Sequence, residues 1–183
     1  MESFLIPLLL IKFAMNNNKA HIKEINDSRI FIVEDDDMHS LMMDYVLSNE
    51  STAHITKFKS GEDCIKHLYM NPDVVILDYG LPGINGIDTF KEIQKHDPDI
   101  PVIVITGNTD NAVARKFLDA GVYDYIRKED DAFEHVGKIT DKILNVMAQK
   151  EAKIENRRTL LFKIGFGVMV MIISVLSYVL LKH

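Results

Sequence analysis

The sequence predicts an α/β fold: a five-stranded doubly wound parallel sheet followed by a C-terminal transmembrane helix. Between residues 28 and 131, five short runs rich in β-branched residues alternate with four longer amphipathic stretches. Strands that alternate with helices form parallel βαβ units with right-handed crossovers, so this rhythm predicts the sheet. Residues 164–181 form an apolar run without charges, and its length predicts a membrane span.

The predicted strands and helices follow from the spacing of apolar residues. The strands cover residues 29–33, 53–58, 74–77, 102–105 and 123–126. Three of these runs are nearly all apolar, as strands buried on both faces are. The stretches between them have one apolar helical face and cover residues 38–49, 61–70, 86–96 and 111–120.

The composition is that of a globular protein with a core, since 47% of the residues are hydrophobic and 26% are charged. This balance argues against a disordered chain. The formal net charge is −6 and no strongly basic face precedes residue 150, so we expect no nucleic-acid partner. The one cysteine, Cys64, excludes an internal disulfide and is predicted in the core or at its boundary.

The pattern divides the chain into four parts. Residues 1–27 are an apolar leader and a polar linker, 28–131 the core domain, 132–159 a final helix continued as a linker helix, and 160–183 the transmembrane helix. The leader is short and has Glu2 where a secretion signal has basic residues. We interpret residues 1–14 as an extension before a true start at Met15; an amphiphilic anchor is the alternative.

Polar side chains gather at the ends of the predicted strands. In a parallel sheet these ends lie at one edge, so the side chains are expected to share a pocket. They are Glu34, Asp35, Asp36 and Asp37 after the first strand, Asp78 at the end of the third, Thr106 at the end of the fourth and Lys128 after the fifth.

Such a pocket has the chemistry of phosphoryl transfer. Clustered carboxylates repel one another unless a cation lies between them, and Mg²⁺ prefers an all-oxygen site with few protein ligands. An aspartate beside Mg²⁺ can act as a nucleophile toward a phosphoryl group, whose oxygens a lysine and a hydroxyl can contact. The strand ends therefore predict a phosphoaspartate site that binds Mg²⁺.

Four segments of this region resemble the receiver domain of response regulators, the phosphoacceptor proteins of two-component signalling. The segments are IFIVEDD at 30–36, VILDYGLPGING at 75–86, ITG at 105–107 and DYIRK at 124–128. They come in the family's order and at similar spacing, within residues 28–131, which are a little over half of the chain. The resemblance implies the flavodoxin-like receiver fold.

The resemblance also implies a role for each matching residue. Asp78 is the implied phosphoacceptor, and Thr106 and Lys128 contact its phosphoryl group. Tyr125 is the aromatic residue whose ring reorients as Thr106 moves, so these two form the switch, and Gly107 is the small residue that follows the threonine. The implied Mg²⁺ ligands are Glu34, Asp35, Asp78 and the backbone carbonyl of Gly80.

Plainer interpretations stay open for single residues. Thr106 would also serve as a helix cap, Tyr125 as strand packing and Lys128 as a surface charge. Asp36 and Asp37 have the character of solvated turn formers. Three scattered histidines show no ligand spacing and are predicted at the surface or the boundary: His39, His54 and His67.

One position departs from the family pattern. The family usually has proline after the lysine, whereas Glu129 follows Lys128 here. A cis peptide bond before a residue other than proline costs about 2.5–4 kcal/mol, so we expect none at this position. The geometry of this loop stays open, and the assignment of the lysine is kept.

The C-terminal run predicts the location of the protein. At 1.5 Å per residue it reaches about 27 Å, close to the hydrocarbon thickness of about 30 Å. Arg157, Arg158 and Lys163 lie on its N-terminal side. The positive-inside rule therefore predicts a single-pass membrane protein with its receiver domain in the cytoplasm. A buried core helix is the plainer alternative.

Together these features predict a membrane-tethered signalling switch or relay, not an enzyme. A histidine kinase or a histidine phosphotransfer protein is the expected partner that phosphorylates Asp78. The alternative is a stand-alone phosphatase or phosphotransferase with an aspartyl-phosphate intermediate, for which little chain remains to form a substrate-selecting cap. A DNA-binding regulator is disfavoured because the residues after 131 are predicted as one helix and an anchor.

The helix after residue 131 has two interpretations. Pairing with a second copy would give a weak homodimer; alternatively, the helix is a tether whose apolar face belongs to the receiver core. The pairing interpretation rests on a seven-residue repeat and its alternate seam: Phe133, Thr140, Met147, Ile154 and Leu161, with Val136 and Ile143.

Overall fold

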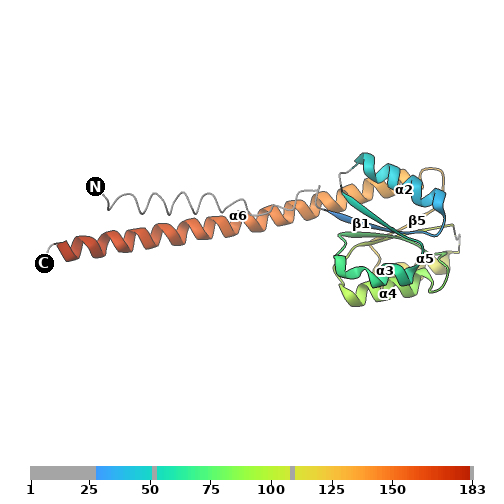
Figure 1. Cartoon of the computed structure of the whole chain (residues 1–183), viewed down its shortest axis with the longest axis horizontal. Coiled ribbons are helices and arrows are strands. Elements are labelled where there is room, and N and C mark those ends of the chain that lie inside the picture. Colours follow the sequence, from blue (N-terminus) through green and yellow to red (C-terminus); the bar gives the residue numbers. More distant parts are fainter. Residues whose placement is uncertain (1–27, 51–52, 108–109, 182–183) are drawn as a thin grey trace. The chain divides into compact units, whose positions relative to one another are not determined.

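The computed structural model describes residues 28–50, 53–107 and 110–181. Strands and helices alternate along the chain (Figure 1). The strands are β1 (Arg29–Val33), β2 (His54–Phe58), β3 (Val74–Asp78), β4 (Val102–Thr106) and β5 (Asp124–Arg127). The helices are α2 (Asp37–Glu50), α3 (Gly61–Lys66), the 3₁₀ turn η3 (Leu68–Met70), α4 (Gly86–His96), α5 (Asn111–Ala120) and α6 (Ala132–Leu181). The predictions for residues 1–27 lie outside the described residues.

The sheet confirms the predicted fold class. All strand pairs are parallel, and the strand order is β2-β1-β3-β4-β5. The order reverses between β1 and β3, which is the switch point at which doubly wound sheets bind ligands. At the neighbouring carboxyl ends, Val33 pairs with Leu77, Asp78 with Ile105, and Thr106 with Arg127.

Two hydrophobic layers hold helices against the sheet. Because successive side chains of a strand point to opposite faces, Phe31 and Val33 belong to one core and Ile30 and Ile32 to the other. Helices α3, α4 and α5 cover the first face, and α2 covers the second together with the first part of α6 (Figure 1). Each fully buried aliphatic or phenyl side chain contributes about 1.5–3 kcal/mol.

The predicted helix at 61–70 is interrupted. The backbone N–H of His67 donates to the carbonyl of Cys64, which tightens the helix end into the 3₁₀ turn. Asn71 then takes a left-handed conformation with φ of 53°, a geometry that asparagine tolerates better than most residues. The spacing of apolar residues predicted one continuous helix, because it carries no information on which carbonyl each backbone N–H binds.

The first part of α6 belongs to the receiver core. Val136, Thr140 and Ile143 are 0–4% exposed, and Phe133 and Met147 pack against the same core cluster. The three buried side chains are therefore not available to a second copy while the domain is folded. At Val136, Thr140 and Ile143 the apolar face is turned to the core, as the alternative interpretation has it, and the homodimer itself stays a prediction.

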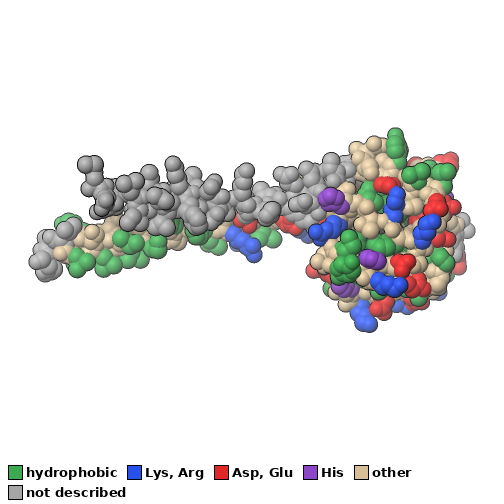
Figure 2. Space-filling model, viewed as in Figure 1, with side chains coloured by type: hydrophobic (Ala, Val, Ile, Leu, Met, Phe, Trp, Pro, Cys, Tyr) green, Lys and Arg blue, Asp and Glu red, His purple; other side chains and the backbone are tan. Residues whose placement is uncertain are grey.

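The second part of α6, from Ala148 onward, lies outside the compact unit formed by residues 23–147. It is helical to Leu181, and its most apolar 18-residue window has a mean hydropathy of 2.3 with none of it buried. Hydrophobic side chains run along it (Figure 2). By length and composition the helix can cross a membrane. The division of the whole chain into four parts stays a prediction.

Candidate functional site

Four neighbouring strand ends bring the predicted site residues to one edge of the sheet. Glu34 follows β1, Asp78 ends β3, Thr106 ends β4, and Lys128 follows the last residue of β5. Because these strands lie side by side in that order, residues far apart in the sequence share one site. Buried apolar strands fix the backbone, and the polar residues begin where the strands leave the core.

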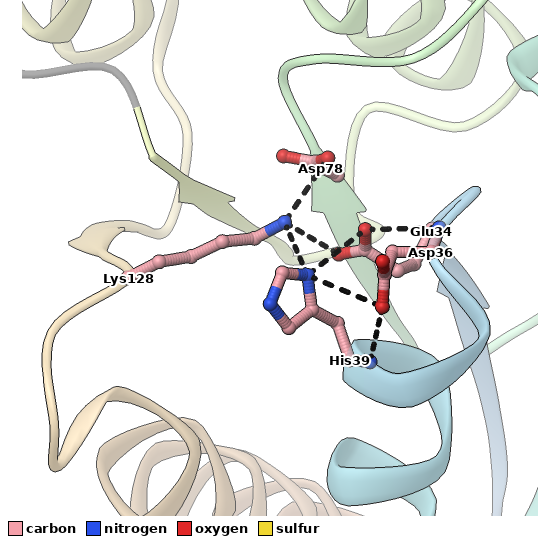
Figure 3. Close-up of polar contacts among 5 residues, drawn as sticks. All are labelled: Glu34, Asp36, His39, Asp78 and Lys128. Carbon is pink, nitrogen blue, oxygen red and sulfur yellow. Dashed lines mark hydrogen bonds and ion pairs between the residues drawn. The ribbon is translucent and has the colours of Figure 1, made fainter.

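Lys128 lies between two buried carboxylates (Figure 3). Its Nζ is 2.8 Å from Glu34 Oε2 and 3.1 Å from Asp78 Oδ2. The side chain of Glu34 is 1% exposed and that of Asp78 7% exposed. A buried carboxylate is costly unless it is paired and hydrogen-bonded, so the Lys128 ammonium, which pairs with both, offsets part of their charge.

The acidic groups fit a divalent cation. One carboxylate oxygen each from Glu34, Asp35 and Asp78 lies within 4.8 Å of the others, and Asp35 is the exposed member. Mg²⁺ binds through one or two carboxylates and keeps several waters, and an exposed member leaves room for them. Gly80 is also adjacent, because a Cβ on it would lie 3.5 Å from Asp78 Oδ2.

The loop after β3 is fixed by its neighbours. The backbone N–H of Ile84 donates to Glu62 Oε1 of α3 at 2.9 Å. Gly86 begins α4 so close to the strand end that a Cβ there would lie 2.8 Å from the Asp78 carbonyl oxygen. The loop that carries Gly80 is therefore held beside Asp78 at two points. The Glu62 carboxylate binds the backbone of Ile84, and the backbone of Gly86 packs against that of Asp78.

The charges at the site shift two pKa values. Burial raises the pKa of the Glu34 carboxyl; the hydrogen bond from Lys128 acts against this, and the charge of Asp78 adds to it. Burial alone would lower the pKa of Lys128, but the hydrogen bond to Glu34 and the charge of Asp78 outweigh it, so that pKa is raised. The pairing thus favours the protonated form of Lys128, whereas burial disfavours the charged form of Glu34.

Thr106 and Tyr125 lie on adjacent strands behind this cluster. Thr106 is 1% exposed, whereas Tyr125 is half-buried and its ring lies 5.9 Å from that of Phe117. Burial raises the pKa of the Tyr125 hydroxyl, and the nearby Thr106 hydroxyl opposes this rise. The Tyr125 oxygen has no hydrogen bond of standard geometry to another described residue. Gly107 follows in an exposed position.

The loop after Lys128 is trans throughout. No cis peptide bond occurs within the described residues, which confirms the expectation for Glu129. The backbone N–H of Lys128 donates to the Thr106 carbonyl at 2.8 Å, and that of Glu129 to the Arg127 carbonyl at 2.8 Å. These two hydrogen bonds fix the start of the loop, at the position where the family usually has a proline.

The sequence did not predict His39 as part of the site. Its Nδ1 lies 3.3 Å from Lys128 Nζ and 3.6 Å from Glu34 Oε1 (Figure 3). Asp36, predicted as a turn former, caps α2 by accepting the backbone N–H of His39 at 2.8 Å. The available signal was the position of His39 in the first helical turn after the acidic run, which points a side chain back toward the strand end.

The chain is similar to proteins of one family. Residues 30–139 match the response regulator receiver domain. The transcriptional regulatory protein CssR of Bacillus subtilis is 38% identical over 99 residues, which are 54% of this chain and 44% of CssR. A cyclic di-GMP phosphodiesterase of Thermotoga maritima is 33% identical over 54% of this chain and 26% of its own length. The chain thus spans less than half of either relative.

A solved structure supports the same assignment. The phosphorylated cyanobacterial phytochrome response regulator RcpA superposes with a TM-score of 0.60 and 25% identity, over 66% of this chain and 96% of RcpA. Phosphorylation on an aspartate is general to the matching family. With five parallel strands in the receiver order and an acidic cluster at their carboxyl ends, this chain belongs to the response regulator receiver family.

Proposed function

We propose that Asp78 accepts a phosphoryl group from a histidine kinase or a histidine phosphotransfer protein, and that the chain acts as a membrane-tethered signalling switch. The observation that carries the proposal is the Lys128 ammonium, 3.1 Å from Asp78 Oδ2. A cation at that distance stabilises charge on a phosphoryl group attached to the same carboxylate. The family's general use of an aspartate as phosphoacceptor supports the same residue.

The acidic residues are the proposed metal ligands. The carboxylates of Glu34, Asp35 and Asp78, with the backbone carbonyl of Gly80, would hold Mg²⁺. When bound, Mg²⁺ supplies positive charge that offsets the carboxylates and the phosphoryl oxygens. Asp35 is the exposed member of the cluster, so we propose that it would bind the cation without breaking a buried ion pair. Glu34 would instead give up its ion pair with Lys128 in order to bind the cation.

The transfer step uses groups that the chain itself provides. A carboxylate oxygen of Asp78 forms a bond to phosphorus while the bond from phosphorus to the donor imidazole nitrogen breaks, and the imidazole leaves with a proton from solvent. Lys128 and the Thr106 hydroxyl contact the phosphoryl oxygens. We propose that Thr106 moves toward them and that the ring of Tyr125 reorients with it.

The proposed location rests on α6. Its second part is long and apolar enough to cross a membrane, and Arg157, Arg158 and Lys163 precede the most apolar residues. The positive-inside rule then orients the helix with the receiver domain in the cytoplasm, where ATP-dependent kinases supply the phosphoryl group. We propose that phosphorylation of Asp78 is read by a partner at the membrane.

The proposal is tested with the full chain in detergent. Incubation with Mg²⁺ and a small phosphodonor is expected to retard the chain on a phosphate-affinity gel, and Asp78→Asn or a chelator is expected to abolish the shift. Asp37→Asn is the matched control, since Asp37 is a neighbouring carboxylate that is 82% exposed and pairs with Lys59. A shift that survives Asp78→Asn refutes the assignment.

The same preparation separates a switch from an enzyme. A switch holds radiolabelled phosphate on the protein, and releases it to water or back to a phosphotransfer protein. A stand-alone phosphotransferase with an aspartyl intermediate passes the label to a small acceptor. Persistent protein-bound label with no labelled small acceptor in a cell extract is the expected result.

A further inference from the structure

His39 lies at the rim of the proposed phosphorylation site. It belongs to the first turn of α2, and its Nδ1 is 3.3 Å from Lys128 Nζ (Figure 3). A lysine ammonium has three N–H donors and no acceptor. The contact is a hydrogen bond in the tautomer that carries its proton on Nε2, in which the ammonium donates to Nδ1.

Three acceptors therefore match the three donors of Lys128. They are Glu34 Oε2 at 2.8 Å, Asp78 Oδ2 at 3.1 Å and His39 Nδ1 at 3.3 Å. Two of these acceptors are themselves carboxylates of the acidic cluster, which a cation would engage. His39 Nδ1 is the acceptor of the three that lies outside the acidic cluster, so a cation that engages Glu34 and Asp78 does not compete for it.

The imidazole is held in place from two sides. Asp36 Oδ1 accepts the backbone N–H of His39 at 2.8 Å and so fixes the first turn of α2. The ring of Phe133, in the first turn of α6, lies 5.7 Å from the imidazole at an angle of 38°. An acceptor fixed by a helix cap and an aromatic contact can orient the flexible lysine side chain.

We propose that His39 is a positioning residue that keeps the Lys128 ammonium beside Asp78 during phosphoryl transfer. The inference rests on the proposed role of Asp78 and assigns His39 no contact with the phosphoryl group. Its predicted effect is on the rate of transfer and not on Mg²⁺ affinity, because His39 lies outside the acidic cluster that would hold the cation.

The test compares three variants of the full chain in detergent. His39→Asn places an amide oxygen close to the position of Nδ1, His39→Gln places it farther out near Nε2, and His39→Leu removes the acceptor but keeps apolar contact with Phe133. With saturating Mg²⁺ and a small phosphodonor, the Leu and Gln variants are expected to be phosphorylated about threefold to tenfold more slowly, the loss expected for one hydrogen bond. The Asn variant is expected to stay within about twofold of the wild type.

A second measurement does not depend on phosphorylation. Acetylation of lysines by a small reagent, followed by mass spectrometry, reports how accessible and how tightly held each ammonium is. Lys128 is expected to be acetylated faster in the Leu and Gln variants than in the wild type and the Asn variant. Lys91, paired with Asp88 on the surface of α4, is the internal reference.

The two measurements separate failure of this inference from failure of the proposed function. If the wild type takes no phosphate, the role of Asp78 fails, and acetylation still decides whether His39 holds Lys128. Equal Lys128 acetylation in the wild type and the Leu variant overturns the inference. So does an Asn variant that is as slow as the Leu variant, or a changed Mg²⁺ affinity in the Leu variant.

Discussion

Lys128 Nζ donates to Glu34 Oε2 at 2.8 Å, although the two residues are 94 positions apart in the sequence. The contact closes the site, because it joins the loop after β5 to the end of β1 across the strands between them. It also places the ammonium where a divalent cation would compete with it for the same carboxylate. The carboxylates that pair with Lys128 in the metal-free protein are thus the ones that would bind the cation. The replacement of the ammonium by the cation can be measured.

Removing the ammonium is expected to destabilise the metal-free protein. In Lys128→Met, Glu34 and Asp78 stay buried without their cation, and we expect a loss of about 1–3 kcal/mol in the free energy of unfolding. Denaturant unfolding with and without Mg²⁺ measures it, and Mg²⁺ should stabilise this variant more than the wild type. Lys91→Met, at a surface pair 62% and 51% exposed, is the control and should change stability little.

A Lys128→Met variant as stable as the wild type without Mg²⁺ would show that the ion pairs only balance the cost of burying them. A variant that Mg²⁺ does not stabilise further would argue against competition between the ammonium and the cation for Glu34. The two results are independent, since the first concerns the metal-free fold and the second the acidic cluster.

Stability of the metal-free chain should depend on pH through Glu34. Burial raises the pKa of this carboxyl above its ordinary value of 4.5, so the folded state holds the proton more tightly than the unfolded state. Its contribution to stability is therefore full below 4.5 and is lost as pH rises through the raised value. Glu34→Gln keeps the acceptor for Lys128 without a charge, and should raise the Tm at pH 7.

The advantage of Glu34→Gln should disappear as pH falls below the ordinary carboxyl pKa, since Glu34 is then neutral in both states. Addition of Mg²⁺ at pH 7 should reverse the ranking, because the amide is a poorer ligand than the carboxylate. Thermal unfolding at several pH values, with and without Mg²⁺, follows both effects. A lower Tm for the variant in metal-free solution at pH 7 would mean that the pairing with Lys128 outweighs burial.

Substitution at Gly86 should loosen the loop that carries the proposed metal ligand. A Cβ at this position would lie 2.8 Å from the carbonyl oxygen of Asp78 and from the Cα of Tyr79, and backbone cannot yield as a flexible side chain can. Gly86→Ala is expected to cost about 1–3 kcal/mol and to weaken Mg²⁺ binding. Gly107→Ala is the matched control, since no atom of the described residues, its chain neighbours aside, lies within 4 Å of a Cβ there.

Similar stability for these two alanine variants would mean that α4 shifts to make room. Denaturant unfolding gives the stability, and calorimetric titration with Mg²⁺ shows whether such a shift reaches the acidic cluster. A Gly86→Ala variant that is as stable as the control but binds Mg²⁺ more weakly would still show that Gly86 shapes the metal site.

The fold and most of the site could be predicted because their signals are local. Apolar strands that end in polar residues define both the sheet and its carboxyl edge, and right-handed crossovers leave few strand orders. The order of the strands along the chain was therefore enough to predict that Asp78, Thr106 and Lys128 meet at that edge. The predicted roles of these residues in phosphorylation remain to be tested.

Two features depended mainly on tertiary contacts. The position of His39 in the first turn of α2 was a local signal, but its contacts arise because the loop after β5 brings Lys128 to it and α6 brings Phe133 behind it. The heptad repeat in α6 predicted an apolar face correctly but could not say which surface covers that face. In the structure the receiver core covers Val136 and Ile143.

Removal of the apolar part of α6 should release the protein from membranes. Deletion of residues 160–183 removes the window with a mean hydropathy of 2.3, and the receiver core keeps Val136, Ile143 and Leu144. Fractionation with an alkaline wash should find the shortened chain in the soluble fraction. Deletion of residues 1–14 is the control and should leave the protein in the membrane. Retention of the C-terminal deletion would assign the anchor to another segment.

The exposed part of α6 is where contact between two copies is still expected. Ile154 is 53% exposed and Leu161 68% exposed, whereas Ile143 is 4% exposed in the core. Anchoring confines the helices to one plane and raises their effective concentration, so Ile154→Cys and Leu161→Cys should form disulfide-linked dimers in membranes. Ile143→Cys is the control and should not, because its thiol would be buried.

The crosslinking requires a background without Cys64, although burial raises the pKa of its thiol to about 12 and makes it unreactive. Cys64→Ala removes the thiol and introduces neither a charge nor a polar group. Crosslinks at residue 154 whose yield changes with phosphodonor, and which Asp78→Asn makes insensitive to it, would connect the site to the helix. Failure of both exposed cysteines to crosslink in membranes would identify the second part of α6 as a monomeric tether.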